Sequence, residues 1–239
     1  MLYRFFLRGV PFYLARHYWW AYLWKPAIWF FDHQIIINAI LFGQYKRLMN
    51  TTLDKLAHTN HQRTLQLTCV YGQFTQKLAK LIAPTQLHIM DVCIHQLHVV
   101  QRKTQAISPV LPTRMNAETL GYKNDSFTTI VLFFLLHELP TEARQNTLSE
   151  CMRTLTVGGS LLLTEYGVLP KQHWLYRNKL TRWLITYYEP FLDSFWHDDL
   201  TKLLNERGKC FGKKVEVISN TDIFNGFYRV TAYKIYAVK

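Results

Sequence analysis

A histidine and a glutamate directly follow a long apolar string in this sequence. Residues 127–136 read FTTIVLFFLL, and His137 and Glu138 come next. An imidazole at the end of a central strand can accept or donate a proton, because its unperturbed pKa is about 6.5. In the structural alternative, the strand stops at Leu136 and the following residues cap a helix near Thr141. In either case we expect Glu138 to face away and to orient the loop.

Other apolar strings also end in residues that suit a ligand. Asp91 closes the string QLHIMDVC, and a carboxylate at this place commonly accepts hydrogen bonds from ribose hydroxyls. Its alternative role is the N-cap of the helical pattern that follows. Gly72 allows a tight turn and a close approach of the backbone, and Asn116 with Ala117 can face an adenine edge.

These candidate residues require a scaffold of alternating strands and helices. Strand-like strings occur at 64–72, 86–93, 108–120, 127–136 and 159–167, and helical patterns at 74–83, 94–105 and 141–155. Continuous apolar strands separated by amphipathic helices predict an α/β fold with a parallel sheet covered on both faces. Ligands of such sheets bind at the carboxyl ends of the strands. The tail, 213–238, predicts two strands around an Asn-rich turn.

Two aromatic and basic segments flank or interrupt this core. We predict a helical extension at 1–63, which includes HYWWAYLWKPAIWFF, and an α/β domain at 64–239 with a helical lid insertion at about 170–208. The extension suits either a lipid interface or a cap that packs on the domain. The lid suits either the cover of a lipid-soluble substrate near anionic head groups or an ordinary helix with a solvated basic face.

Composition limits the class of protein. A chain of 239 residues with 49% hydrophobic residues can bury one sizeable core, and a net charge of +12 favours an anionic partner such as a membrane surface. Nucleic acid is not expected, since no basic-aromatic sheet motif or Cys/His finger is present. The four cysteines lack metal-ligand spacing, which predicts a reduced, cytoplasmic protein. We expect neither a signal peptide nor a spanning helix.

The sequence also resembles a known enzyme superfamily. NAETLGYKNDSFTTIVLFFLLHELP at 116–140 and TLSECMRTLTVGGSLLLTEYG at 147–167 resemble the adenine-binding loop, the fourth strand and the approach to the fifth strand of class I S-adenosylmethionine-dependent methyltransferases. With VPFYLARHYWWAYLWKPAIWFFD, ILFGQY, CVYGQFT and YYEPFLDSFW added, the chain resembles the rhodoquinone-biosynthesis branch from about Val10 to its end. This resemblance implies a Rossmann-like, mostly parallel seven-stranded sheet with a C-terminal antiparallel hairpin and an N-terminal helical extension.

The resemblance implies an activity as well. Members of that branch convert ubiquinone to rhodoquinone by replacing a ring methoxy group with an amino group, with S-adenosylmethionine as amino donor and a divalent metal such as manganese. The protein would then act on a membrane quinone, on the inner face of a membrane or the matrix side of a mitochondrial one. Two other classes stay open: a methyltransferase for another lipophilic acceptor, and a catalytically silent binding protein.

The site residues implied by the resemblance follow the strand ends. Tyr71 and Gly72 would line the methionine end of the cofactor, Asp91 and Val92 the ribose, and Asn116 and Ala117 the adenine. Phe134 would face the cofactor. The catalytic residues would be His137, Glu165 and Tyr166. Metal ligands are not assigned from the sequence.

The chain departs from the superfamily pattern at two turns. Gln66 replaces the usual carboxylate of the first strand, and Thr68, Val70 and Tyr71 occupy places where glycines normally leave room for the cofactor. Gly167 stands where the rhodoquinone branch carries a histidine. The first departure predicts that the cofactor sits differently or binds weakly, and the second predicts a changed substrate or a lost activity.

Overall fold

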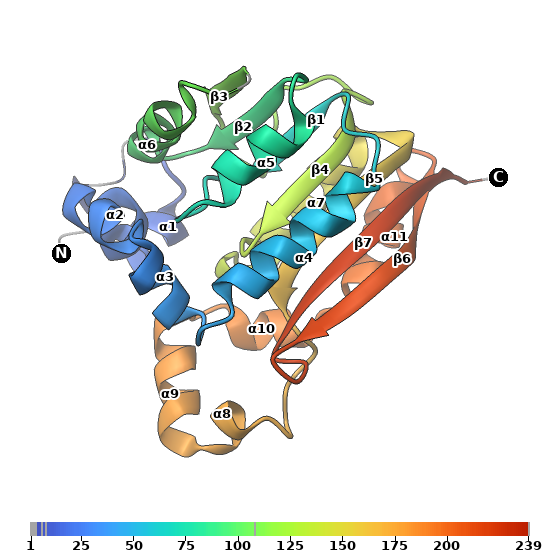
Figure 1. Ribbon diagram of the computed structural model, residues 1–239. Helices are drawn as coiled ribbons and strands as arrows, with labels where there is room; N and C mark the ends of the chain where they lie inside the picture. The colour runs from blue at the N-terminus through green and yellow to red at the C-terminus, as the bar shows by residue number, and fades with distance from the viewer. Residues whose placement is uncertain (1–3, 6, 8, 108, 239) are drawn as a thin grey trace.

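The fold is built around one seven-stranded sheet. The computed structural model describes residues 4, 5, 7, 9–107 and 109–238, so a few positions of the predicted N-terminal extension lie outside the described residues. The strand order is β3-β2-β1-β4-β5-β7-β6 (Figure 1). The strands are β1 (Thr64–Leu67), β2 (Leu87–Asp91), β3 (Val110–Arg114), β4 (Phe127–Phe133), β5 (Leu155–Tyr166), β6 (Lys213–Ile223) and β7 (Tyr228–Ala237).

The strand directions confirm the predicted α/β class. Strands β1 to β5 pair in parallel, whereas β7 runs antiparallel to both β5 and β6. Every residue of β4 is buried, as expected for a central strand whose two faces are both covered by helices. The predicted Asn-rich turn joins β6 and β7, where Phe224, Asn225 and Gly226 all adopt positive φ.

Helices cover both faces of the sheet. In Figure 1, α4 and α5 lie in front of the sheet and α11 lies behind it. Helix α7 packs against α11 and β5, and α6 packs against β2 and β3. Their bounds are α4 (Tyr45–Ala57), α5 (Phe74–Ile82), α6 (Ile94–Thr104), α7 (Thr141–Thr154) and α11 (Leu200–Lys209). Helix α4 falls inside the predicted extension, yet its buried face joins the core of the sheet.

Two further groups of helices gather near the carboxyl ends of the parallel strands (Figure 1). The N-terminal group comprises α1 (Phe12–His17), the π-helix η2 (Trp19–Leu23), α2 (Lys25–Phe31) and α3 (Gln34–Ile40). The inserted group comprises α8 (Trp174–Arg177), α9 (Lys179–Tyr188) and α10 (Leu192–Trp196). Among the described helices, none has the length and apolar character needed to cross a bilayer.

The sequence misplaces the end of the fourth strand. The apolar run continues to Leu136, but β4 stops at Phe133 and Leu136–Glu138 forms a single 3₁₀ turn. Phe134 has a φ of +57°, which takes the chain out of the extended conformation. Leu135 and Leu136 are buried although they lie outside the strand, so hydrophobicity alone overestimates the length of β4.

One tyrosine holds the turn after β1 against α4. The buried Tyr45 hydroxyl donates to the Tyr71 carbonyl oxygen at 3.0 Å. It also accepts from the backbone N–H groups of Gln73 and Phe74, at 2.8 and 3.0 Å. Gly72 has a φ of +77°, and a Cβ there would lie 2.6 Å from the Tyr45 hydroxyl oxygen. The glycine therefore serves the close packing of this turn.

We predict that Tyr45→Phe lowers the free energy of unfolding by about 1–3 kcal/mol, because the buried N–H of Phe74 and the partly buried N–H of Gln73 lose their acceptor. Chemical denaturation monitored by circular dichroism measures the change. Tyr187→Phe is the matched control, since that side chain is 65% exposed. Equal stability of Tyr45→Phe and the control would contradict this account of the turn.

Candidate active site

A cavity at the carboxyl ends of the strands collects most of the predicted cofactor residues. Asp91 and Val92 line it after β2, Asn116 and Ala117 after β3, and Phe134 after β4. Residues of the N-terminal helices also line it, namely Tyr13, Leu14 and Tyr22. We call this the strand-end cavity. The structure thus brings five of the predicted residues together under the N-terminal helices, while their individual roles stay predictions.

Asp91 is the buried carboxylate of this cavity. Its two oxygens accept the backbone N–H groups of Cys69 and Cys93, at 2.8 and 2.7 Å. Burial raises the pKa of Asp91 to about 6, although these hydrogen bonds favour the ionised form and limit the shift. Asp91 therefore ties the turn after β1 to the start of α6 and still presents a carboxylate to the cavity.

The turn after β1 explains why glutamine can replace a carboxylate there. Gln66 is buried, and its amide nitrogen donates to the Thr68 carbonyl oxygen at 2.9 Å and to the Thr75 hydroxyl at 3.0 Å. Thr68 itself has a φ of +64°. A carboxylate could not donate to that carbonyl, so the amide stabilises this form of the turn. Within the described residues the Gln66 side-chain oxygen makes no hydrogen bond.

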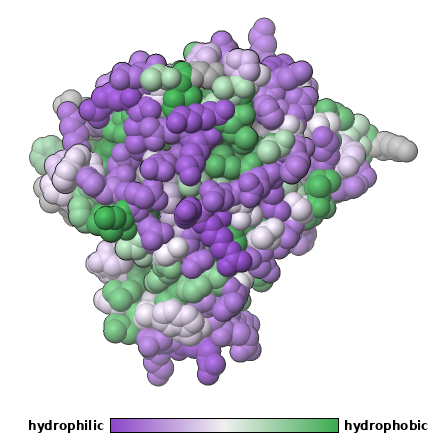
Figure 2. Space-filling view, in the orientation of Figure 1, coloured by the Kyte–Doolittle hydropathy of each residue, from purple (hydrophilic) through white to green (hydrophobic). Residues whose placement is uncertain are grey.

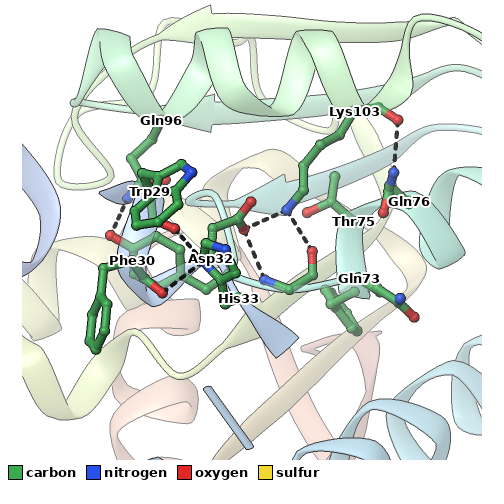
Figure 3. A network of polar contacts seen from close by, with 12 residues as sticks. Trp29, Phe30, Asp32, His33, Gln73, Thr75, Gln76, Gln96 and Lys103 are labelled. Carbon is green, nitrogen blue, oxygen red and sulfur yellow. Dashed lines mark hydrogen bonds and ion pairs between the residues drawn. The ribbon is translucent and has the colours of Figure 1, made fainter. Parts of the chain in front are cut away.

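Gly72 and Tyr71 are engaged mainly by other parts of the protein. The Gly72 N–H donates to Asp32 at 3.1 Å, and Lys103 donates to the Gly72 carbonyl oxygen at 2.7 Å and pairs with Asp32 (Figure 3). Tyr71 donates its hydroxyl to the Ala21 carbonyl oxygen at 2.5 Å. The N-terminal helices are therefore fastened to the turn that the resemblance assigns to the methionine end of the cofactor.

A second cavity lies beside the first and shares Tyr22, Cys69, Phe134 and Glu138 with it. Its walls are largely aromatic and aliphatic. The remaining lining residues are Ile37, Ile40, Leu41, Tyr45, Val70, Tyr71, Phe133, His137, Tyr166 and Glu189. We call this the aromatic cavity. The shared residues mean that a ligand in one cavity can reach a group in the other.

His137 is held at the aromatic cavity by a buried glutamate. Glu165 accepts from His137 Nδ1 at 2.7 Å with one oxygen, and with the other from the backbone N–H groups of Leu135 and Leu136, at 2.8 and 2.6 Å. The Tyr166 ring lies 4.8 Å from the imidazole, centroid to centroid. The three predicted catalytic residues are therefore neighbours, with His137 Nε2 left for other partners.

Two further carboxylates face His137 Nε2. Glu189 Oε2 lies 3.8 Å and Glu138 Oε1 lies 4.0 Å from it. Burial disfavours the charged imidazole, but the negative charges of Glu165, Glu189 and Glu138 outweigh burial and raise the pKa of His137 to about 9. Burial likewise raises the pKa of Glu138 and Glu189.

The expectation that Glu138 faces away is wrong. Glu138 lines both cavities and accepts a short hydrogen bond from the Tyr22 hydroxyl, because the 3₁₀ turn after β4 rotates it inward. Glu189 was not predicted at all. It follows α9, and the Tyr18 hydroxyl donates to it at 3.0 Å. The only sign of Glu189 in the sequence is an isolated carboxylate before Pro190. Its partner in space, His137, lies 52 residues earlier in η3, so no local spacing relates the two residues.

Backbone packing accounts for the glycine after β5. The Gly167 N–H donates to the Phe227 carbonyl oxygen at 2.9 Å, and a Cβ at Gly167 would lie 1.9 Å from the Gly226 carbonyl oxygen. A histidine at this position therefore requires the β6–β7 turn to move. The imidazole of this site comes from His137.

Comparison with known proteins agrees with this fold. Residues 64–159 match a family described as "Methyltransferase domain". The chain also has the fold of a solved S-adenosylmethionine-dependent methyltransferase from Methanosarcina mazei, with a TM-score of 0.51 and 15% identity over 74% of this chain and 92% of that one. Residues 64–159 are therefore similar to a methyltransferase domain, and the chain shares the fold of this solved methyltransferase. These findings support the superfamily but leave the rhodoquinone branch as a proposal.

Curated relatives are named for quinone biosynthesis. The chain is 30% identical to a demethylmenaquinone methyltransferase of Lactiplantibacillus plantarum, over 54% of this chain and 55% of that relative. It is 28% identical to a ubiquinone/menaquinone biosynthesis C-methyltransferase of Erwinia tasmaniensis, over 56% of this chain and 55% of that relative. The chain thus spans about half the length of the curated relatives it matches.

We predict that binding of S-adenosylhomocysteine weakens as pH falls through the Asp91 pKa of about 6, because only the carboxylate accepts both ribose hydroxyls. One pH unit below that pKa, the affinity should be about tenfold lower than at neutral pH. Calorimetric titration at about pH 5 and about pH 8 measures this difference. Asp91→Asn should bind weakly with little pH dependence, and equal wild-type affinity at both pH values would exclude Asp91 as the ribose acceptor.

Proposed function

We propose that this protein is an S-adenosylmethionine-dependent enzyme that converts ubiquinone to rhodoquinone at a membrane surface, replacing a ring methoxy group with an amino group. The observation that carries the proposal is the junction of two cavities: a strand-end cavity with a buried carboxylate, and an aromatic cavity that holds His137. The names of the curated relatives and the resemblance to the rhodoquinone branch support a quinone as substrate.

In this proposal the strand-end cavity takes the adenosine part of the cofactor. Asp91 would accept the ribose hydroxyls, and Asn116 with Ala117 would face the adenine. Phe134 borders both cavities, so the reactive end of the cofactor would pass this ring to meet the substrate. Tyr13 and Tyr22, from the N-terminal helices, would contact the bound cofactor.

The aromatic cavity suits a flat, apolar quinone ring. Aromatic side chains give broad apolar contact, and a few polar groups fix orientation. His137 would face the quinone ring through Nε2, while Glu165 holds the other ring nitrogen. Tyr166 packs across the imidazole and limits its rotation.

The outer face of the inserted helices supports a membrane location. On α9, Leu180, Trp183 and Tyr187 are 57–65% exposed, and Lys179 and Arg182 lie on the same helix. Figure 2 shows hydrophobic residues on the left side of the lower lobe, which contains α8 and α9. Exposed aromatic side chains beside cations are typical of segments that bind the head-group region of anionic bilayers.

Methyl transfer is the second candidate, because both curated relatives are named methyltransferases. Mass spectrometry of the product distinguishes the two reactions, since an amino group is lighter than the methoxy group it replaces whereas methylation adds mass. Ubiquinone should give the lighter product with this protein. A heavier, methylated product would contradict the rhodoquinone proposal and support methyl transfer.

We predict that His137→Ala abolishes quinone turnover while S-adenosylhomocysteine still binds, because His137 lines the aromatic cavity and not the strand-end cavity. Product formation and calorimetric affinity are measured on the same preparation. His98→Ala, on the exposed face of α6, is the matched control. Unchanged turnover in His137→Ala would remove His137 from the mechanism.

We predict that the protein sediments with vesicles of phosphatidylglycerol and phosphatidylcholine, and that the double variant Trp183→Ser, Tyr187→Ser loses most of this binding. Added salt should weaken the interaction, because part of it is electrostatic. Ile218→Ser is the matched control, since Ile218 is 60% exposed on the edge strand β6. No sedimentation at moderate salt, or equal loss in the control, would count against the proposed membrane contact.

A further inference from the structure

We propose that His137 Nε2, Glu138 and Glu189 form a binding site for one divalent transition-metal ion at the aromatic cavity. One ligand atom from each residue lies within 4.8 Å of the other two. The inference deepens the proposed function by naming an ion-binding role for the same site. The ion site is argued from side-chain geometry and charge, and these do not depend on the identity of the substrate.

The spacing of the ligand atoms suits coordination better than direct hydrogen bonding. The imidazole nitrogen lies 3.8 Å from Glu189 Oε2 and 4.0 Å from Glu138 Oε1. Both separations exceed the donor–acceptor distance of about 2.7–3.2 Å that is usual for an N–H···O hydrogen bond. Ligands about 2.0–2.2 Å from a shared ion lie about 3–4 Å apart. Small side-chain movements would therefore bring all three atoms into coordination distance.

Outer hydrogen bonds already orient each of the three ligands. Glu165 fixes His137 through Nδ1, which is the usual arrangement of a metal-binding histidine backed by a carboxylate. Tyr22 donates to Glu138, and Tyr18 donates to Glu189. The oxygens that the tyrosines hold, Glu138 Oε1 and Glu189 Oε2, are the same ones that face His137 Nε2, and each keeps a further lone pair for an ion.

The charge balance of the cluster also favours a cation. The side chain of His137 is 3% exposed, and those of Glu138 and Glu189 are 13% and 22% exposed. Within the described residues, the ion pairs of Glu138 and Glu189 are with His137 alone. Three carboxyl groups, those of Glu138, Glu165 and Glu189, share one imidazole, and a bound cation would stabilise their ionised forms against the cost of burial.

The donor set indicates the class of ion. Imidazole nitrogen favours first-row transition metals, and carboxylate oxygen is shared by these metals with Mg²⁺ and Ca²⁺. A mixed set of one nitrogen and two oxygens, open toward a cavity, therefore suits Mn²⁺ or Zn²⁺ better than Ca²⁺. When bound, such an ion would polarise an oxygen atom of a substrate in the aromatic cavity.

The ligands also join distant parts of the fold. His137 and Glu138 lie in the turn after β4, whereas Glu189 follows α9 in the inserted helices. Tyr18 and Tyr22, which hold the two carboxylates, belong to the N-terminal helices. A bound ion would therefore fasten the inserted helices to the sheet and should raise the thermal stability of the protein.

The test is calorimetric titration of the chelator-treated full chain with Mn²⁺, without quinone or S-adenosyl compound, so that failure of the proposed reaction does not affect it. We expect one ion per chain and a rise in Tm. Glu189→Gln keeps the shape of the side chain and should lower affinity at least about tenfold, since it removes a charged ligand. Nitrogen coupling in the electron paramagnetic resonance spectrum of bound Mn²⁺ should disappear in His137→Ala.

The matched control is the double variant His95→Ala, His98→Ala. These two histidines lie on α6 with ring centroids 6.4 Å apart and are the natural place for adventitious metal binding. The control should bind Mn²⁺ as the wild type does. Absence of stoichiometric binding by the folded wild type would overturn the proposal, as would binding that survives Glu189→Gln and His137→Ala but is lost in the control.

Discussion

The buried carboxylate of Glu165 is the interaction on which the geometry of the site depends. Because Phe134 turns the chain away from β4, the N–H groups of Leu135 and Leu136 leave the sheet and need another acceptor. Glu165, near the end of the neighbouring strand β5, accepts both and also binds His137 Nδ1. One side chain therefore sets the path of the turn and the direction of the imidazole.

The remainder of the site is supplied by segments outside the parallel core. The N-terminal helices contribute Tyr18 and Tyr22 to the two carboxylates that face His137. The same helices are fastened to the turn after β1 through Asp32 and through the hydrogen bond of Tyr71 to Ala21. Because Tyr13 and Tyr22 also line the strand-end cavity, the position of the N-terminal helices would affect the binding of the proposed cofactor.

The sequence predicted the sheet well because burial on both faces leaves a continuous apolar pattern, as in β4. It also placed Asp91 and His137 at strand ends, where parallel sheets gather their ligands. The predictions of the strand end and of the direction of Glu138 were wrong. Both features depend on the positive φ at Phe134, which cannot be predicted from an apolar residue type. Glu189 was missed because its partners lie on other elements and no local spacing relates them.

Local packing also explains the departures from the superfamily pattern. Gln66 suits a turn in which Thr68 needs a donor for its carbonyl oxygen, and Gly167 suits a backbone that touches Gly226. Both substitutions fit local packing, so neither by itself argues for a lost activity. The fold alone does not determine the reaction, because function depends on the residues at the site.

The most direct test of the account is a crystal structure of the protein grown with S-adenosylhomocysteine. The account predicts the adenosine in the strand-end cavity, with the ribose hydroxyls on Asp91 and the adenine beside Asn116, and with the sulfur directed past Phe134 toward His137. A ligand bound elsewhere, or one whose sulfur points away from the aromatic cavity, would contradict the claim that the two cavities form one active site.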